Sequence, residues 1–127
     1  MERSPRPLRP LRWIASSRRD FGEFPSRVLE TFGHRLFLAQ TGLHPPSAKP
    51  LKGLGSGVVE LLEEFDGDAY RAVYTVRFVS AVYVLHAFKK KSKRGMATPQ
   101  SDVELIKRRL ADAEADNAAR VKKERPP

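Results

Sequence analysis

The sequence predicts an α+β domain in which an N-terminal strand, a helical hairpin and a C-terminal helix surround a three-stranded antiparallel meander. Three segments after residue 57 are apolar or alternate between apolar and polar residues, with short turns between them, as consecutive strands do. Before and after them, apolar residues recur every three or four positions, as in amphipathic helices. The chain has 127 residues, 40% hydrophobic and 31% charged, which fits one globular domain.

We expect this domain to cover residues 11–116, with a flexible basic arm at 1–10 and a flexible tail at 117–127. The arm is rich in proline and arginine, and is either a leader without a role or a segment that adds contacts to nucleic acid. It lacks the apolar stretch of a secretory signal. No apolar run approaches the roughly 20 residues that span a bilayer, and cysteine is absent. We therefore expect a cytoplasmic protein with no membrane partner.

A short strand and two helices are expected in the first third of the chain. Residues 11–15 (LRWIA) form an apolar run suited to a strand, and Ser16 or Ser17 can cap the helix that follows. Pro25 breaks that helix and suits the first position of the next one. The second helix carries apolar side chains at i, i+4 and i+8, and Gly42 ends it.

The middle of the chain is expected to be a loop followed by the meander. Residues 43–57 are rich in proline and glycine and predict a loop. The strands are predicted at 58–65, 70–78 and 81–88, with Asp66-Gly67-Asp68 as a hairpin turn. The first of these also has the leucine and glutamate content of a short helix, but its β-branched start favours a strand. The last is apolar on both faces, which is typical of a central strand.

The last helix is predicted to begin near Thr98-Pro99, an N-cap followed by proline at the first helical position. Ser101 to Glu104 offers an alternative capping box. The apolar stripe of this helix ends at Ala113. Beyond it the segment is charged and rich in alanine, which leaves open an exposed helix or a frayed end.

Several kinds of catalytic site are not supported by the residue patterns. The three histidines lack metal-ligand spacing, so we expect neither a metal site nor a cofactor. Acidic residues between 60 and 66 are clustered, but such clusters usually form a solvated face rather than a carboxylate pair. The sequence GLGSG at 53–57 lacks the spacing of nucleotide-binding loops.

Basic residues are the most informative class, because the formal net charge is +9 and such a balance favours polyanionic partners. On one concave face of the meander they would form a phosphate-binding surface. The alternative is a solvated strand end that keeps the protein soluble. The candidate RNA-binding residues are Lys49, Lys52, Arg77, Lys89, Lys93 and Arg94, around Arg71 in the second predicted strand.

Three segments carry patterns that can be compared with a known family. They are KPLKGLGSGVVEL at 49–61, YRAVYTV at 70–76 and VLHAFKKKSKRGMATPQSDVELIKRRL at 84–110. These patterns, and the predicted order of elements, resemble the RelE/ParE toxin superfamily and its phage-derived HigB-like branch. The resemblance covers residues 11–112 and implies a RelE-like fold.

The resemblance also implies an activity and two partners. Members of this branch are toxins of type II toxin–antitoxin systems, which cut messenger RNA on the ribosome by metal-independent attack of the 2′-hydroxyl on the adjacent phosphate. The cognate antitoxin is usually a helix-turn-helix protein. Other members of the superfamily poison gyrase without cutting RNA, so the alternative function is a non-catalytic toxin that inhibits gyrase or binds nucleic acid.

The resemblance further assigns roles to individual residues. Arg71 matches the arginine that contacts the scissile phosphate, and Lys90 and Lys91 match basic positions at the end of the last strand. One of these lysines, or His86, would assist proton transfer. The tyrosine that follows this strand in the best-studied branch is replaced here by Gly95-Met96-Ala97. The resemblance therefore supplies no group that stacks on a base.

Overall fold

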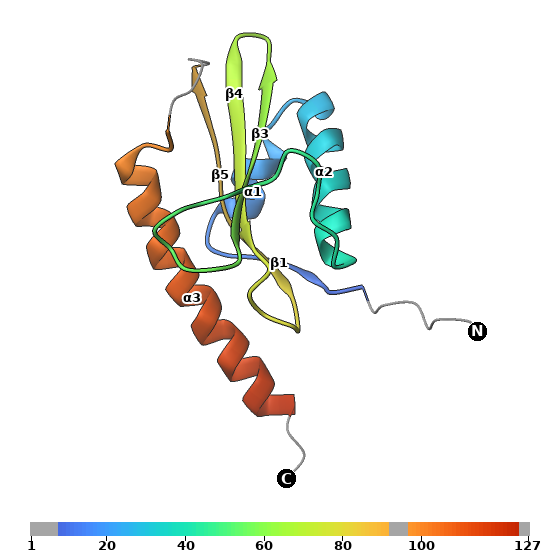
Figure 1. The fold of residues 1–127 in the computed structure, drawn as a ribbon, viewed down its shortest axis with the longest axis vertical. Coiled ribbons are helices and arrows are strands. Elements are labelled where there is room, and N and C mark those ends of the chain that lie inside the picture. The colour runs from blue at the N-terminus through green and yellow to red at the C-terminus, as the bar shows by residue number, and fades with distance from the viewer. Residues whose placement is uncertain (1–7, 92–96, 125–127) are drawn as a thin grey trace, which may run out of the picture.

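The fold is a five-stranded mixed sheet with helices on both faces (Figure 1). The computed structural model describes residues 8–91 and 97–124. Along the chain, the elements are β1 (Leu11–Trp13), α1 (Ser17–Gly22), α2 (Ser26–Gln40), β2 (Lys49–Pro50), β3 (Val58–Phe65), β4 (Asp68–Thr75), β5 (Val82–Lys91) and α3 (Gln100–Glu124). The order of strands across the sheet is β1-β5-β4-β3-β2. The prediction of an α+β protein is thus confirmed.

The centre of the sheet is the predicted meander, because β3 pairs with β4 and β4 pairs with β5, both antiparallel. The bounds of β3 agree with the prediction, whereas β4 stops at Thr75, before Phe78. The sheet has two more strands than the meander. The predicted N-terminal strand, β1, joins β5 in parallel, and the two residues of β2 join β3. β2 lies in the predicted loop and is too short to show a periodicity.

Helices α1 and α2 cover one face of the sheet and bury the larger aromatic cluster of the core. Phe24 and Phe32 lie at the centre, with Phe24 packed edge-on against Tyr70 of β4 at a centroid distance of 5.0 Å. The predicted stripe of α2 is buried as expected at Val28, Phe32 and Leu36. Gly42 follows this helix with φ of +88°, a conformation that favours glycine at a helix end.

Helix α3 covers the opposite face with a smaller apolar cluster. Its buried side chains include Ile106, Leu110 and Ala113, which pack on Val73 of β4 and Leu85 of β5. The helix then continues beyond the sheet (Figure 1). It reaches Glu124, so residues 117–124 of the predicted tail continue as an exposed helix, one of the two possibilities that the sequence left open.

A β-bulge in β5 decides which side chains face α3. Val73 of β4 pairs with His86, but the next residue, Tyr74, pairs with Val84, so Leu85 is the extra residue of β5. Leu85 therefore packs into the α3 core while His86 also faces α3. Val84 and Ala87 point to the opposite face.

The end of the predicted N-terminal arm is part of the folded domain. The guanidinium of Arg9 donates hydrogen bonds to the carbonyls of Ala39, Val76 and Phe78, at 3.0–3.2 Å. Gln40 donates to the Arg9 carbonyl at 2.7 Å. Arg9, which we expected in the flexible arm, is therefore fixed against the domain, and residues 1–7 of the predicted arm lie outside the described part of the chain. No helix within residues 8–91 and 97–124 combines the length and apolarity needed to cross a membrane.

Candidate functional site

A pocket of about 380 Å³ opens on the α3 side of the sheet, between the β2 loop, the β3–β4 hairpin and the segment leading into α3. It brings together Lys49, Lys52 and Arg71, three of the basic residues that the sequence analysis grouped. Two acidic residues, Glu60 and Glu64, also line it. The pocket is therefore a mixed site of cations and carboxylates rather than a purely basic surface.

Arg71 lies deep in this pocket beside a carboxylate. One guanidinium nitrogen, Nη1, is 3.7 Å from Oε1 of Glu60, and the two side chains are only 6% and 14% exposed. The Thr98 hydroxyl joins them, because it donates to Glu60 Oε2 at 2.6 Å and accepts from Arg71 Nη1 at 3.2 Å. Thr98 thus binds across to the sheet, and α3 begins at Gln100 rather than behind a threonine cap.

Lys90 lies on the same face of the sheet, at the rim of the pocket. In the β4–β5 register it pairs with Ala69, which lines the pocket, so Lys90 and Arg71 are diagonal neighbours. Such neighbours are about 7–8 Å apart, within reach of long side chains. The Lys90 Nζ lies 3.9 Å from Oδ2 of Asp102, in the first turn of α3.

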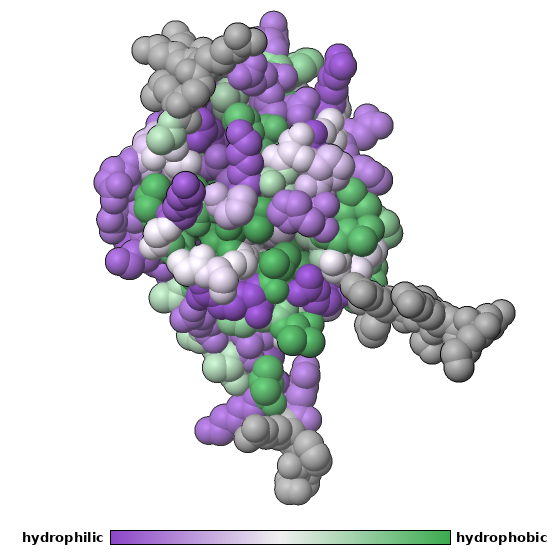
Figure 2. All heavy atoms as spheres, viewed as in Figure 1, coloured by the Kyte–Doolittle hydropathy of each residue, from purple (hydrophilic) through white to green (hydrophobic). Residues whose placement is uncertain are grey.

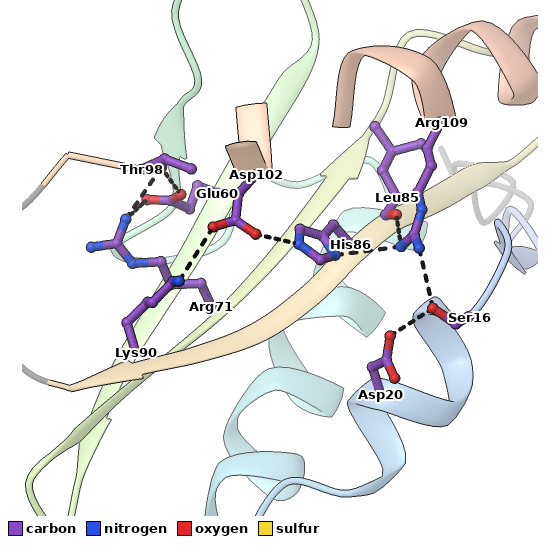
Figure 3. A network of polar contacts seen from close by, with 10 residues as sticks. All are labelled: Ser16, Asp20, Glu60, Arg71, Leu85, His86, Lys90, Thr98, Asp102 and Arg109. Carbon is purple, nitrogen blue, oxygen red and sulfur yellow. Dashed lines mark hydrogen bonds and ion pairs between the residues drawn. The ribbon is translucent and has the colours of Figure 1, made fainter. Parts of the chain in front are cut away.

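His86 is held in a buried polar network that continues from Asp102 (Figure 3). Its Nε2 is 2.8 Å from Asp102 Oδ1, and its Nδ1 is 3.4 Å from Nη1 of Arg109. The ring stacks on Phe88 at a centroid distance of 4.6 Å. Burial lowers the pKa of His86, against the opposing effect of the Asp102 carboxylate. The imidazole is therefore neutral near pH 7, with both ring nitrogens engaged.

The network ends at α1. Arg109 donates to the Leu85 carbonyl at 3.0 Å and to Ser16 Oγ at 3.1 Å. Ser16 in turn donates to Asp20 at 2.7 Å, and this hydrogen bond holds the pKa of Asp20 below its ordinary value. One polar row thus connects the pocket rim with the helix on the other face of the sheet (Figure 3).

The other predicted RNA-binding residues lie away from this pocket or outside the part of the chain that the structure describes. Lys89 points to the face of α1 and lies 3.9 Å from Asp68. Arg77 follows the far end of β4, where it binds the carbonyls of the 54–57 loop and, at 2.6 Å, Glu114 of α3. Lys91 is described only as a backbone position of β5, and Lys93 and Arg94 lie outside the described residues.

The residues that sequence reasoning missed are Glu60, Thr98 and Asp102. Glu60 belonged to an acidic cluster that we expected to be solvated, but the β3–β4 register places it diagonal to Arg71. Thr98 and Asp102 were expected to cap the last helix and lie in the segment that carries the family resemblance, but no role in the site was predicted for them. One sequence feature could have indicated them: both residues follow the basic end of β5 closely. The chain must turn back there, which places the start of α3 over β4 and β5. No group of three or more potential metal ligands occurs within the described ranges.

The chain was compared with known proteins. The family model "Phage derived protein Gp49-like (DUF891)" matches residues 19–111, which include the larger part of α1, all of α2, the whole meander and the first half of α3. No curated protein gave a match. No solved structure gave one either. The matched region contains every side chain of the pocket and all of the polar row except Ser16.

Proposed function

This chain belongs to the phage-derived Gp49-like family, and on that premise we propose that it is the toxin of a type II toxin–antitoxin system. We further propose that it is a metal-independent endoribonuclease that cuts messenger RNA on the ribosome, in the cytoplasm. The observation that carries this proposal is the pairing of Arg71 with Glu60 in one pocket, beside Lys49 and Lys52. A carboxylate can accept the proton of an attacking 2′-hydroxyl, and a guanidinium can stabilise the charge that develops on the phosphate.

In this mechanism Glu60 is the proton acceptor. Its carboxylate takes the proton of the ribose 2′-hydroxyl, whose oxygen attacks the adjacent phosphorus. The bond from phosphorus to the 5′-oxygen breaks, which leaves a 2′,3′-cyclic phosphate and a 5′-hydroxyl. The 5′-oxygen takes a proton from the ammonium of Lys90 at the pocket rim. Atoms and charges balance without a further reactant.

Arg71 supplies positive charge for the transition state. The phosphorane carries more negative charge than the substrate, and a fixed guanidinium aimed at it contributes a few kcal/mol, roughly 3–4 for one well-placed donor. Thr98 and Glu60 hold the Arg71 side chain in place before the substrate arrives, so little reorganisation is needed. Lys49 and Lys52 line the same pocket and are placed to bind neighbouring phosphates.

The proposal is tested by induced expression in a bacterial host, followed by mapping of transcript ends. We expect growth arrest and new cuts within translated codons, both suppressed by a cognate antitoxin, which we expect to be a helix-turn-helix protein. Replacing Arg71→Ala together with Lys90→Ala should abolish both effects. Arg71→Lys should weaken cutting while keeping a positive charge beside Glu60, which separates loss of chemistry from loss of folding.

A matched control removes the same charge elsewhere. Lys107 and Arg108 are exposed on α3, outside the pocket, and Lys107→Ala with Arg108→Ala should leave the cuts in place. Normal toxicity in the Arg71 and Lys90 double variant would refute the site. Intact messages accompanied by DNA damage would instead favour the non-catalytic alternative, in which the toxin inhibits gyrase. That alternative is consistent with Arg71 and Lys90 already facing carboxylates.

A further inference from the structure

Arg109 is a buried cation that has hydrogen-bond partners but no carboxylate at ion-pair distance within the described residues. Its side chain comes from α3 and the residue is only 9% exposed. Within the described residues, no carboxylate lies at ion-pair distance from it, and its hydrogen bonds go to the Leu85 carbonyl and the Ser16 hydroxyl. Burying a charge without a direct counter-charge is costly, by several kcal/mol in real proteins. Asp20 is linked to Arg109 by hydrogen bonds through Ser16 and otherwise acts on it only as a more distant charge.

Arg109 determines which ring nitrogen of His86 is unprotonated. A guanidinium has five N–H donors and no acceptor, so the nitrogen of His86 that faces it must carry a lone pair. That nitrogen is Nδ1, at 3.4 Å from Arg109 Nη1. The proton of the neutral ring is therefore on Nε2, which donates it to Asp102 Oδ1 at 2.8 Å. Figure 3 shows the ring between the two groups, with one nitrogen turned to each.

His86 in turn orients the carboxylate of Asp102, and this carboxylate faces Lys90. With Oδ1 held by the ring, the second oxygen of Asp102 is turned toward Lys90, 3.9 Å away (Figure 3). Lys90 is 48% exposed, so its long side chain has few other contacts to fix it. The oriented carboxylate of Asp102 therefore restricts where the ammonium group of Lys90 lies.

We propose that Arg109 is a positioning residue, which fixes His86 as the Nε2–H tautomer and thereby holds Asp102 in the orientation that places Lys90 at the pocket rim. The role at Lys90 rests on the proposed ribonuclease function, whereas the control of the tautomer does not. His86 then acts as a neutral connector and not as the proton-transfer group that the family resemblance implied. The charged groups facing it are Asp102 and Arg109 from α3, with Asp20 of α1 behind Ser16.

The tautomer is read directly in the ¹⁵N-labelled full chain, from long-range nitrogen–proton correlations of the His86 ring. At pH 7 we expect a protonated Nε2 and an unprotonated Nδ1 in the wild-type protein. In Arg109→Met, Nδ1 loses the cation that keeps its lone pair unprotonated, while Asp102 still holds the proton of Nε2, so part of the ring should become doubly protonated. Arg108→Met, which removes an exposed charge one residue away, is the matched control and should leave the ring unchanged. Ser16→Ala, which removes only the α1 end of the row, should also leave it unchanged.

Cutting of messenger RNA is measured on the same variants. Arg109→Met should lower the cutting rate by roughly tenfold to a hundredfold, as misplacement by about 1 Å can do. His86→Gln separates positioning from proton transfer, because its amide N–H can donate to Asp102 and its carbonyl can accept from Arg109, yet it does not titrate. It should cut at close to the wild-type rate, whereas His86→Ala should not.

The outcomes distinguish this proposal from the proposed function. An unchanged ring pattern in Arg109→Met, or loss of cutting in a folded His86→Gln variant, would overturn the positioning role. A wild-type protein that does not cut RNA would overturn the proposed function, while a protonated Nδ1 in Arg109→Met would still support the control of His86 by Arg109.

Discussion

Glu60 and Arg71 lie diagonally across two neighbouring strands and face each other at 3.7 Å, with the Thr98 hydroxyl bonded to both. The three residues come from β3, β4 and the segment before α3, so the contact forms only when the meander and the last helix have assembled. Both charged side chains are largely buried. Loss of either partner would leave an uncompensated charge, which typically costs about 3–5 kcal/mol. A variant that removes one of these partners should therefore be checked for folding beside its activity.

Thr98→Val should lower the free energy of unfolding by about 1–3 kcal/mol, because a methyl group would replace the hydroxyl and leave two buried polar groups with fewer partners. Denaturation in urea measures the change. Thr98→Ser keeps the hydroxyl and serves as the control, with a smaller loss expected. Equal losses in the two variants would show that the hydroxyl does not hold Glu60 and Arg71 together.

Gly55→Ala should destabilise the protein more than Gly53→Ala. Both glycines have positive φ, of +82° and +87°, so both variants incur a backbone cost of about 1–2 kcal/mol. Only at Gly55 would the new Cβ meet another group, since Arg77 Nη2 would lie 2.7 Å away. That nitrogen binds the carbonyls of Leu54 and Ser56. The difference in free energy of unfolding between the two variants measures what the binding of Arg77 contributes, and no difference would show that Arg77 shifts without cost.

Stability should fall as the pH is lowered below about 6.5. The unfolded chain takes up a proton on His86 below its ordinary pKa of about 6.5, whereas the lowered pKa of the folded protein moves this uptake to more acidic pH, so acid favours unfolding. The slope is at most about 1.4 kcal/mol per pH unit. Asp20 and Asp116 have lowered pKa values too, but their contributions are lost only below about pH 4.

Urea denaturation across this pH range tests the assignment to His86, with His86→Gln as the comparison. The variant should lose this part of the pH dependence. If it keeps the wild-type slope between pH 6.5 and 5, another group is responsible.

Tyr83→Phe should loosen the part of α3 that follows Ala113. The hydroxyl of Tyr83 donates to Asp116 at 2.5 Å from the core of the α3 face, and burial raises the pKa of Tyr83 to about 12. Its loss should cost about 1 kcal/mol, since Arg120 still binds Asp116. Faster amide exchange in residues 114–120 is the measurement. Ser80→Ala, which removes an exposed hydrogen bond to Asn117, should have a smaller effect.

The sequence allowed the main elements to be predicted, because their patterns are long. β3 and the stripes of α2 and α3 follow the alternation and the helical spacing of apolar residues. β2 could not be predicted in this way, because its two residues are defined by pairing with β3 rather than by a local pattern. The end of α3 was left open, because beyond Ala113 the helix is stabilised by polar contacts, such as that of Tyr83 with Asp116, rather than by an apolar stripe.

The site was predicted in part. Lys49, Lys52 and Arg71 do meet in one pocket. Alternation along the predicted second strand placed Arg77 on the same face as Arg71, but the strand ends at Thr75 and Arg77 turns to the glycine-rich loop. The carboxylates were missed because Glu60 and Asp102 approach the cations through strand register and helix placement. Neither is visible in the spacing of residues along the chain.

The bulge at Leu85 lets β5 carry one residue more than β4 without changing the faces of the residues on either side of it. Tyr74 pairs with Val84 and Val73 pairs with His86, so Leu85 alone is extra, and it lies on the α3 side together with His86. Deleting Leu85 should therefore close the bulge and keep Lys89 toward α1 and Lys90 toward α3, with the loss of the packing of Leu85 against α3. A chain one residue shorter at this point could thus keep the same polar row.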